Sequence, residues 1–247
     1  MPGVRRRRIP LDMNSTGRRR TSQGTIMKTV IAIAAAVSAA GLLAAAPALA
    51  ADSQGYQPLG KGAFKIDLRV SDVVPDANNA IVTAGGVDSG LKARVGDSVM
   101  PTLGFTYFFT DQLSIEAIAG FTRHTVSAVD GTGASTRVHS TWVLPPVVTL
   151  QYHPFPKARI NPYVGVGANL MVYFAGTDYN GFKVGLKDEF GYAFQAGADI
   201  GIVGPWSLNL DAKKVFTKTT ANINDGALFS HVGLDPWVVS VGVSRHF

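Results

Sequence analysis

The sequence predicts an all-β fold, an eight-stranded antiparallel transmembrane β-barrel with short periplasmic turns and longer extracellular loops. Three observations lead to this prediction. Apolar and polar residues alternate with period 2 in segments of about ten residues. The chain begins with an export-type leader, and only 16% of its residues are charged, against roughly 25% in soluble domains. Alternating strands that carry few charges are typical of a protein whose outer surface faces lipid.

The leader accounts for the formal net charge of +6. Residues 1–50 hold eight basic residues and one acidic residue, so residues 51–247 carry a net charge of −1. After Met27 and a lysine comes an alanine-rich apolar stretch that ends in Ala48-Leu49-Ala50. This is the pattern of a secretory signal peptide cleaved after Ala50. Because the mature chain is nearly neutral, no nucleic-acid partner is predicted.

We interpret residues 1–26 as an upstream extension that is absent from the mature protein, residues 27–50 as the signal peptide and residues 51–247 as the barrel. Two alternatives fit less well. A transmembrane anchor needs about 20 apolar residues, and this stretch is short and meets Pro47 beside the cleavage site. A twin-arginine signal is the other alternative, but Arg19-Arg20 precede Thr-Ser-Gln-Gly and not an apolar run.

Eight alternating segments are separated by clusters of glycine, asparagine, aspartate or proline, as expected for strands. The predicted strands cover residues 62–70, 99–109, 113–120, 141–152, 163–174, 192–200, 206–213 and 237–247. Short connections lie near Thr110, Pro154 and Gly204. Long connections are expected at residues 74–98, 128–140, 175–187 and 219–235. Connections that alternate in length are typical of membrane barrels, whose short turns are periplasmic and whose long loops are extracellular.

A soluble eight-stranded barrel of the lipocalin type is the alternative fold, with its apolar residues inside. Alternation alone does not distinguish the two, because it does not say which face is the inner one. The export signal, the final Phe247 and the aromatic residues near strand ends favour the membrane barrel. These aromatic residues are Phe109, Trp142, Tyr152, Phe174, Trp206 and Trp237.

Seven charged residues lie on the face opposite the apolar one. An eight-stranded barrel is just wide enough for side chains to fill its interior, and unpaired charges there would be costly. We therefore expect a mutually neutralising network that blocks a continuous water pore, with an ion-conducting path as the alternative. The seven residues are Lys65, Asp67, Arg69, Glu116, Asp199, Asp211 and Lys213.

The sequence predicts no enzyme, no cofactor and no metal site. With no cysteine in the chain, disulfides, thiolate ligands and a cysteine nucleophile are excluded. The five histidines lack H-x-x-x-H or H-E-x-x-H spacing. A lipid-hydrolase pair of Ser140 with His124 or His139 is conceivable, but the chain offers no G-x-S-x-G context for it.

Five short segments, each present once, follow one another along the chain in an order typical of a known family. They are Phe121-Thr122-Arg123-His124, Leu144-Pro145-Pro146, Asn161-Pro162-Tyr163-Val164-Gly165-Val166-Gly167, Leu186-Lys187-Asp188-Glu189-Phe190-Gly191 and Leu234-Asp235-Pro236-Trp237-Val238. Together they resemble the OmpW family of eight-stranded outer-membrane proteins, over residues 62–247. Two positions depart from the family pattern: Phe190 replaces a usual tryptophan, and Arg245 replaces a tyrosine near the C-terminus. Phe247, on which the C-terminal assembly signal depends most, is kept.

The resemblance implies a porin-like barrel for passive uptake of small hydrophobic molecules, with an exit through the barrel wall into the bilayer. Together with the alternation it also implies a hydrophobic pocket above the charges, lined by the inward residues Phe108, Ile118, Met171 and Tyr173.

The proline pair offers a physical reason for such an exit. Proline has no N–H for the strand ladder, so Pro145 and Pro146 interrupt pairing in a wall where other amides are bonded. A lateral opening beside this strand is therefore expected. The alternative is that the pair only bends the strand near the outer rim.

Location and partners follow from the same resemblance. It implies the bacterial outer membrane, contacts with outer-membrane lipids and lipopolysaccharide, insertion by the outer-membrane assembly machinery with Phe247 as the signal, and small hydrophobic solutes as cargo. The alternative function belongs to another class. A barrel resembling the small OmpA-type domains would be structural or receptor-like and would act through its extracellular loops.

Overall fold

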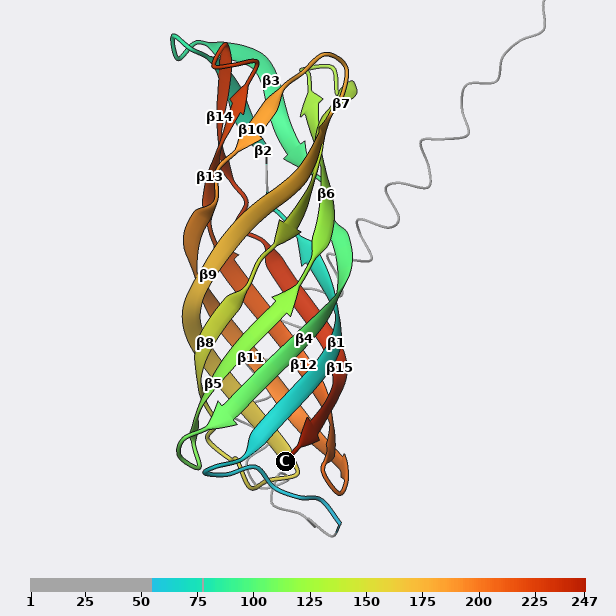
Figure 1. The fold of residues 1–247 in the computed structure, drawn as a ribbon, viewed down its shortest axis with the longest axis vertical. Coiled ribbons are helices and arrows are strands. Elements are labelled where there is room, and N and C mark those ends of the chain that lie inside the picture. The colour runs from blue at the N-terminus through green and yellow to red at the C-terminus, as the bar shows by residue number, and fades with distance from the viewer. Residues whose placement is uncertain (1–54, 77) are drawn as a thin grey trace, which may run out of the picture.

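The computed structural model describes residues 55–76 and 78–247. The predicted upstream extension (residues 1–26) and signal peptide (residues 27–50) lie outside these residues. Within the described part, 15 strands form one continuous sheet, which rolls into the tall barrel of Figure 1. No helix in this part is long and apolar enough to cross a membrane.

A closed ring of antiparallel strands forms the lower half of the barrel in Figure 1. In order around the ring, the strands are β1 (Phe64–Val74), β4 (Ser98–Phe108), β5 (Leu113–Gly120), β8 (Val147–Tyr152), β9 (Ile160–Asp178), β11 (Glu189–Val203), β12 (Trp206–Phe216) and β15 (Trp237–His246). β15 pairs with β1, and Phe247 N donates to Phe64 O at 2.8 Å. The predicted eight-stranded antiparallel barrel is confirmed.

Seven further strands continue the wall upward: β2 (Asn78–Thr83), β3 (Asp88–Val95), β6 (Thr122–Val129), β7 (Ser135–Leu144), β10 (Val184–Leu186), β13 (Lys218–Ile223) and β14 (Leu228–Gly233). Together with the upper part of β9 they pair in the order β10-β13-β14-β2-β3-β6-β7-β9. The four long connections are therefore largely strand hairpins that extend the barrel. The expectation that these segments are mainly loops was wrong.

Irregular pairing explains why the upper strands were not recognised. The register shifts between Ile81 and Val82 and between Val126 and Ser127. Ala175 in β9 has a positive φ of 50°. Each irregularity interrupts the period-2 pattern. β13 and β14 pair without a register shift, but each has only six residues.

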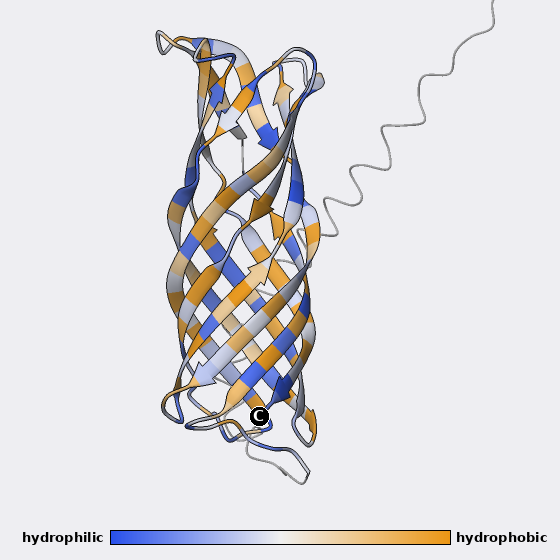
Figure 2. Ribbon diagram, viewed as in Figure 1, coloured by the Kyte–Doolittle hydropathy of each residue, from blue (hydrophilic) through white to orange (hydrophobic). Residues whose placement is uncertain are grey.

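The outer face of the lower ring is apolar. Its side chains are exposed in the isolated barrel and match the outward set predicted from alternation. Figure 2 shows hydrophobic (orange) and hydrophilic (blue) residues alternating along the strands of this ring. Examples are Leu68, Val70, Leu103, Phe105, Ile115, Val148, Leu150, Val166, Leu210 and Val241. This surface needs lipid around it, because a soluble protein rarely exposes so large an apolar area.

Two cation–aromatic pairs delimit this apolar band on adjacent strands. At the lower edge Trp206 pairs with Arg245, whose guanidinium lies 5.6 Å from the indole ring. At the upper edge Lys214 pairs with Trp237, with the ammonium 5.4 Å from the indole ring. Eight residues separate the two edges on each strand, which is about 26 Å along the strand. Tilted strands reduce this to roughly 20 Å across the membrane, close to the height of about 25 Å usual for the apolar band.

Polarity reverses above this band. The inward side chains are polar in the lower ring and mostly apolar higher up, among them Ile81, Val138 and Ile223. Conversely, the outward side chains of the upper strands include exposed cations, such as Lys92 and Arg137. The upper wall therefore has the polarity of a water-soluble barrel and projects beyond the membrane.

Val241 tests the position of the membrane. It lies in β15 between Trp237 and Arg245 and is 49% exposed. Val241→Arg is expected to lower the free energy of unfolding by about 2–4 kcal/mol, because it moves a cation to the bilayer midplane. Denaturant unfolding in lipid vesicles measures this. Val87→Arg is the control, since Val87 is 66% exposed in the upper hairpin between β2 and β3. Equal losses in both variants would contradict the assignment.

Candidate functional site

Seven buried charged side chains cross the lower lumen as one chain of ion pairs, each at most 4% exposed. Lys65 Nζ lies 2.9 Å from Asp199 Oδ2 and 3.3 Å from Asp67 Oδ1. The remaining pairs in the chain are Asp67–Arg69 at 2.9 Å, Arg69–Glu116 at 2.5 Å, Glu116–Lys213 at 3.2 Å and Lys213–Asp211 at 2.5 Å. The structure thus brings together all seven residues singled out from the sequence.

Neutral polar groups extend this network. Gln195 Nε2 donates to Glu116 Oε2 at 2.8 Å and to Asp211 Oδ2 at 2.6 Å. Tyr163 donates to Asp211 at 2.9 Å and accepts from Asn209 at 3.0 Å. These three residues were not assigned to the network from the sequence, although alternation placed them on the inner face. Such bonds lower the cost of burying ion pairs, although Arg69 Nε and Nη1 have no hydrogen-bond partner among the described residues.

Glycines in the wall make room for the largest members of the network. A Cβ added to Gly242 would lie 2.6 Å from Arg69 Cα, and one added to Gly197 would lie 2.5 Å from Tyr163 Cζ. Both distances are shorter than real Cβ contacts allow. The glycines therefore act as spacers, which lets side chains fill the narrow lumen from wall to wall.

The network lies between two other layers. Below it, Phe108 packs on His153 with ring centroids 4.7 Å apart, and His153 lies 5.2 Å from the Tyr163 ring. Above it, an apolar layer closes the lumen; its members are Val73, Met100, Ile118, Val147, Ala193, Val215 and Val238. Downward passage from the upper barrel therefore meets first an apolar floor and then the charges.

An apolar cavity occupies the upper barrel above this floor, with a volume of about 760 Å³ that includes its open mouth. Its lining is predominantly apolar, as is usual for sites that bind small organic molecules. Most lining residues come from the upper strands, among them Ile81, Val95, Val138, Val143, Leu186, Ala221, Ile223 and Leu234. The sequence did not reveal these residues, because they lie in segments that were expected to be loops or near strand ends.

The four residues proposed from the sequence as pocket lining are distributed over three layers. Met171 and Tyr173 line the cavity. Ile118 belongs to the apolar floor. Phe108 lies at the opposite end of the lumen beside His153 and does not line the cavity. It was misplaced because alternation predicts the face of a residue but not its height in the barrel.

The proline pair coincides with a break in the wall. β5 and β8 are paired up to Ile118 and Val147, and β6 and β7 resume with Thr122 and Val143. Between them, residues 119–121 face residues 144–146 without ladder pairing. On the opposite side the strand stays attached to β9, since Pro146 O accepts from Leu170 N at 3.1 Å.

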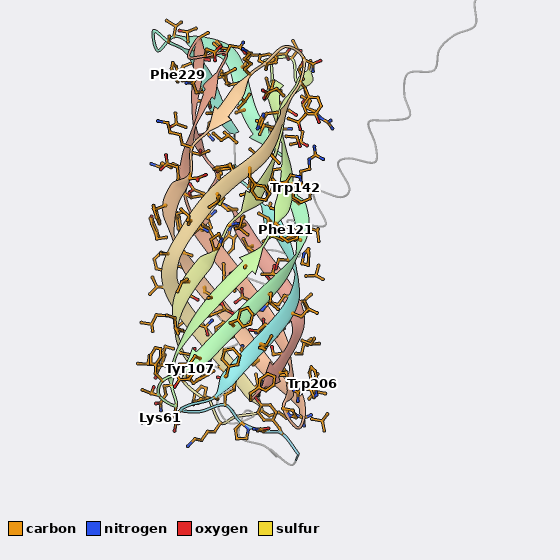
Figure 3. All side chains as sticks on the ribbon, viewed as in Figure 1. Lys61, Tyr107, Phe121, Trp142, Trp206 and Phe229 are labelled. Atoms are coloured by element: carbon orange, nitrogen blue, oxygen red, sulfur yellow. The ribbon has the colours of Figure 1, made fainter. Side chains whose placement is uncertain are left out.

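Two aromatic side chains lie beside this break, as Figure 3 shows. The Phe121 and Trp142 rings meet edge to face with their centroids 6.1 Å apart. Phe121 is 57% exposed, so this ring stands on the outer surface of the wall. The pair marks the break on the side that faces lipid.

The hydrolase alternative finds no support in the described geometry. Ser140 Oγ accepts from Arg123 Nε at 3.0 Å and bonds to neither proposed histidine. His139 Nδ1 pairs with Asp178 at 2.7 Å, and His124 Nδ1 pairs with Gly96 O at 2.8 Å. Among the described residues, no group of three or more His, Cys, Asp or Glu side chains could hold a metal ion.

Lys213 tests the energetics of the charged network. Lys213→Met is expected to lower the free energy of unfolding by about 3–5 kcal/mol, because Glu116 and Asp211 lose a buried partner. The double variant Lys213→Met/Glu116→Gln is the control. It removes one charge of each sign and should recover part of the loss. Denaturant unfolding in vesicles measures both variants, and an equal or larger loss in the double variant would show that charge balance does not matter.

Comparisons with known proteins agree with this architecture. The model of the OmpW family matches residues 60–247. The chain is 30% identical over 228 residues to the uncharacterized outer-membrane protein y4mB of Sinorhizobium fredii, which covers 90% of this chain and 96% of the relative. It is 27% identical over 180 residues to the dibenzothiophene metabolism operon protein PahQ of Pseudomonas aeruginosa, covering 72% of this chain and 85% of the relative.

A solved structure matches as well. The crystal structure of the outer membrane protein OprG from Pseudomonas aeruginosa superimposes with a TM-score of 0.72 at 27% identity, over 79% of this chain and 99% of OprG. The family match spans the entire barrel, from before β1 to Phe247. The chain therefore belongs to the OmpW family and is an outer-membrane β-barrel protein.

Proposed function

We propose that the barrel is a passive channel for small hydrophobic molecules, which enter the upper cavity from outside and leave sideways into the outer membrane. The observation that carries this proposal is the apolar cavity above a lumen that side chains close. A hydrophobic molecule gains free energy by leaving water for such a cavity, at about 25 cal/mol per Å² of apolar surface buried.

The closed lower lumen argues for a lateral exit. A solute that continued downward would have to separate the apolar floor and then the ion pairs centred on Arg69 and Glu116. Breaking a buried ion pair costs several kcal/mol. The bilayer, by contrast, lies on the other side of a single wall at the level of the break beside Pro145 and Pro146.

The break supplies a weak point in that wall. In hydrocarbon every backbone group must be bonded within the barrel, and prolines cannot donate to the neighbouring strand. Val143, on the strand just above the break, lines the cavity. A solute in the cavity therefore lies close to the place where the fewest hydrogen bonds must separate.

The name of one relative points to the same class of solute. PahQ is described as a protein of a dibenzothiophene metabolism operon, and dibenzothiophene is a small apolar heteroaromatic molecule.

Recognition of Phe247 by the assembly machinery and contact with lipopolysaccharide stay predictions. The structural or receptor-like alternative predicts no solute flux and is separated from the channel by the first experiment below.

Replacing the prolines tests the lateral exit. In Pro145→Ala/Pro146→Ala two amide donors return. Adjacent N–H groups of a strand point to opposite sides, and Pro146 already faces β9, so the donor at position 145 can pair with residues 119–121 and unfolding is expected to cost about 1 kcal/mol more. Uptake of labelled naphthalene into whole cells is expected to fall toward the level of cells without the barrel. Pro101→Ala, in β4, is the control and should leave uptake unchanged. Unchanged uptake in the double variant would show that the prolines only bend the strand and do not form an exit. If the wild-type barrel gives no more uptake than cells without it, the structural or receptor-like alternative is favoured.

Conductance tests the closed lumen. The wild-type barrel in a planar bilayer is expected to give no steady ion current in potassium chloride, because the chain of ion pairs from Asp199 to Asp211 leaves no continuous water path. Stable current steps that scale with salt concentration would show instead that the lumen conducts ions.

A further inference from the structure

Exposed cations gather on one part of the upper wall, the outer face of β3, β6 and β7. The three strands contain a single acidic residue, Asp88, which begins β3 at the top of the barrel and accepts from Gly90 N at 2.9 Å. Residues 51–247 together carry a net charge of −1, so this local excess of positive charge is not a property of the whole mature chain. The cations, called the basic patch below, are Lys92, Arg94, Arg123 and Arg137.

No carboxylate neutralises the basic patch. In the part of the chain that the structure describes, none of the ion pairs includes any of the four cations. Asp97 follows β3 and takes part in none of these pairs either. Asp130 follows β6, and its Oδ1 accepts from the amides of Thr132 and Ala134 in its own loop. The patch is therefore open to an anion from outside the protein.

Two arginines of the patch stand in one row across the strands. Arg94 in β3 and Arg137 in β7 both pair with Ser127 of β6, which lies between them. Two strand spacings separate their Cα atoms, about 10 Å, so both side chains can reach one anionic group placed over β6. The Arg137 guanidinium lies 4.8 Å from the centre of the Tyr179 ring. Such stacking orders the side chain and uses its face, not the N–H groups at its edge.

Arg123 connects the patch to the membrane surface. It pairs with Trp142, whose ring meets that of Phe121 on the side of the wall that faces lipid (Figure 3). Arg123 Nε donates to Ser140 Oγ at 3.0 Å, and Ser140 lies two residues above Trp142 on β7. The guanidinium is thus turned upward, as arginines at a membrane interface are. Because aromatic girdles mark the interface of a membrane barrel, the patch begins at the level of the outer-leaflet headgroups.

From this arrangement we infer that the basic patch binds the phosphate groups of lipopolysaccharide, the phosphorylated glycolipid of the outer leaflet. The resemblance to the family implies contact with lipopolysaccharide but names no residue for it, and this inference assigns the contact to one side of the barrel. Arginine suits the ligand because its planar guanidinium can donate two parallel bonds to a phosphate. Lys92, two residues above Arg94 on β3, adds a further positive charge. The inference goes beyond the channel and does not depend on it.

Binding of lipid A, the phosphorylated membrane anchor of lipopolysaccharide, tests the patch. The mature barrel in detergent micelles is titrated with lipid A and with lipid A whose phosphates have been removed, and native mass spectrometry counts the bound lipid. We expect the phosphorylated form to bind about tenfold more tightly or better. In Arg94→Gln/Arg137→Gln its Kd should rise by about 30-fold, because two cations beside an anionic group are lost. The Kd of the dephosphorylated form should stay unchanged.

Matched variants make the test specific. Lys61→Gln/Lys157→Gln removes the same charge from exposed side chains at the lower end of the barrel and should not change binding. Arg94→Lys/Arg137→Lys keeps both charges and should lose less affinity than the glutamine variant. Denaturant unfolding checks that the variants are folded, which is expected because both arginines are exposed.

Three results would overturn the inference. The first is equal binding of lipid A with and without phosphates, and the second is wild-type affinity in the folded Arg94→Gln/Arg137→Gln variant. The third is displacement of lipid A by inorganic phosphate at equal concentration, which would identify a site for the free anion instead of the glycolipid.

Discussion

Hydrocarbon offers a backbone amide no partner other than the protein itself, and the architecture of this barrel depends on that constraint. The wall must close, so the last strand returns to the first through the β15–β1 ladder and the bond from Phe247 to Phe64. Closure with eight strands makes the lumen so narrow that side chains fill it. A proline pair in such a wall is exceptional, because it removes two donors where no solvent can replace them.

The polarity of the inner and outer faces of the wall depends on height in the barrel. In the membrane the wall is apolar outside and polar inside, and the inner charges, three cations and four carboxylates, pair with one another around Arg69 and Glu116. Above the membrane the outside meets water, so the inside can become apolar, and a cavity forms there. The same wall thus builds a closed lower lumen and an apolar chamber, and the proline break lies between the two levels.

The regular strands and the charged network could be predicted from the sequence because both depend on period 2 alone. Leu103 and Thr102 are neighbours on opposite faces of β4, and the alternation that separates them runs without interruption through that strand. Phe108 shows the limit of such reasoning: its face was predicted, but its height was not. Among the residues around the cavity, Ile81 lies in a hairpin whose register shift hides the period, and Ala221 lies in β13, a strand of only six residues.

By itself the sequence determined the class of protein, the eight strands of the lower ring, the apolar outer face and the set of inward charges, because these follow from local alternation. Only the tertiary structure decided which layers meet in the lumen and that the expected loops extend the barrel. Those features depend on register and stagger between strands far apart in the chain, which residue order along one strand does not contain.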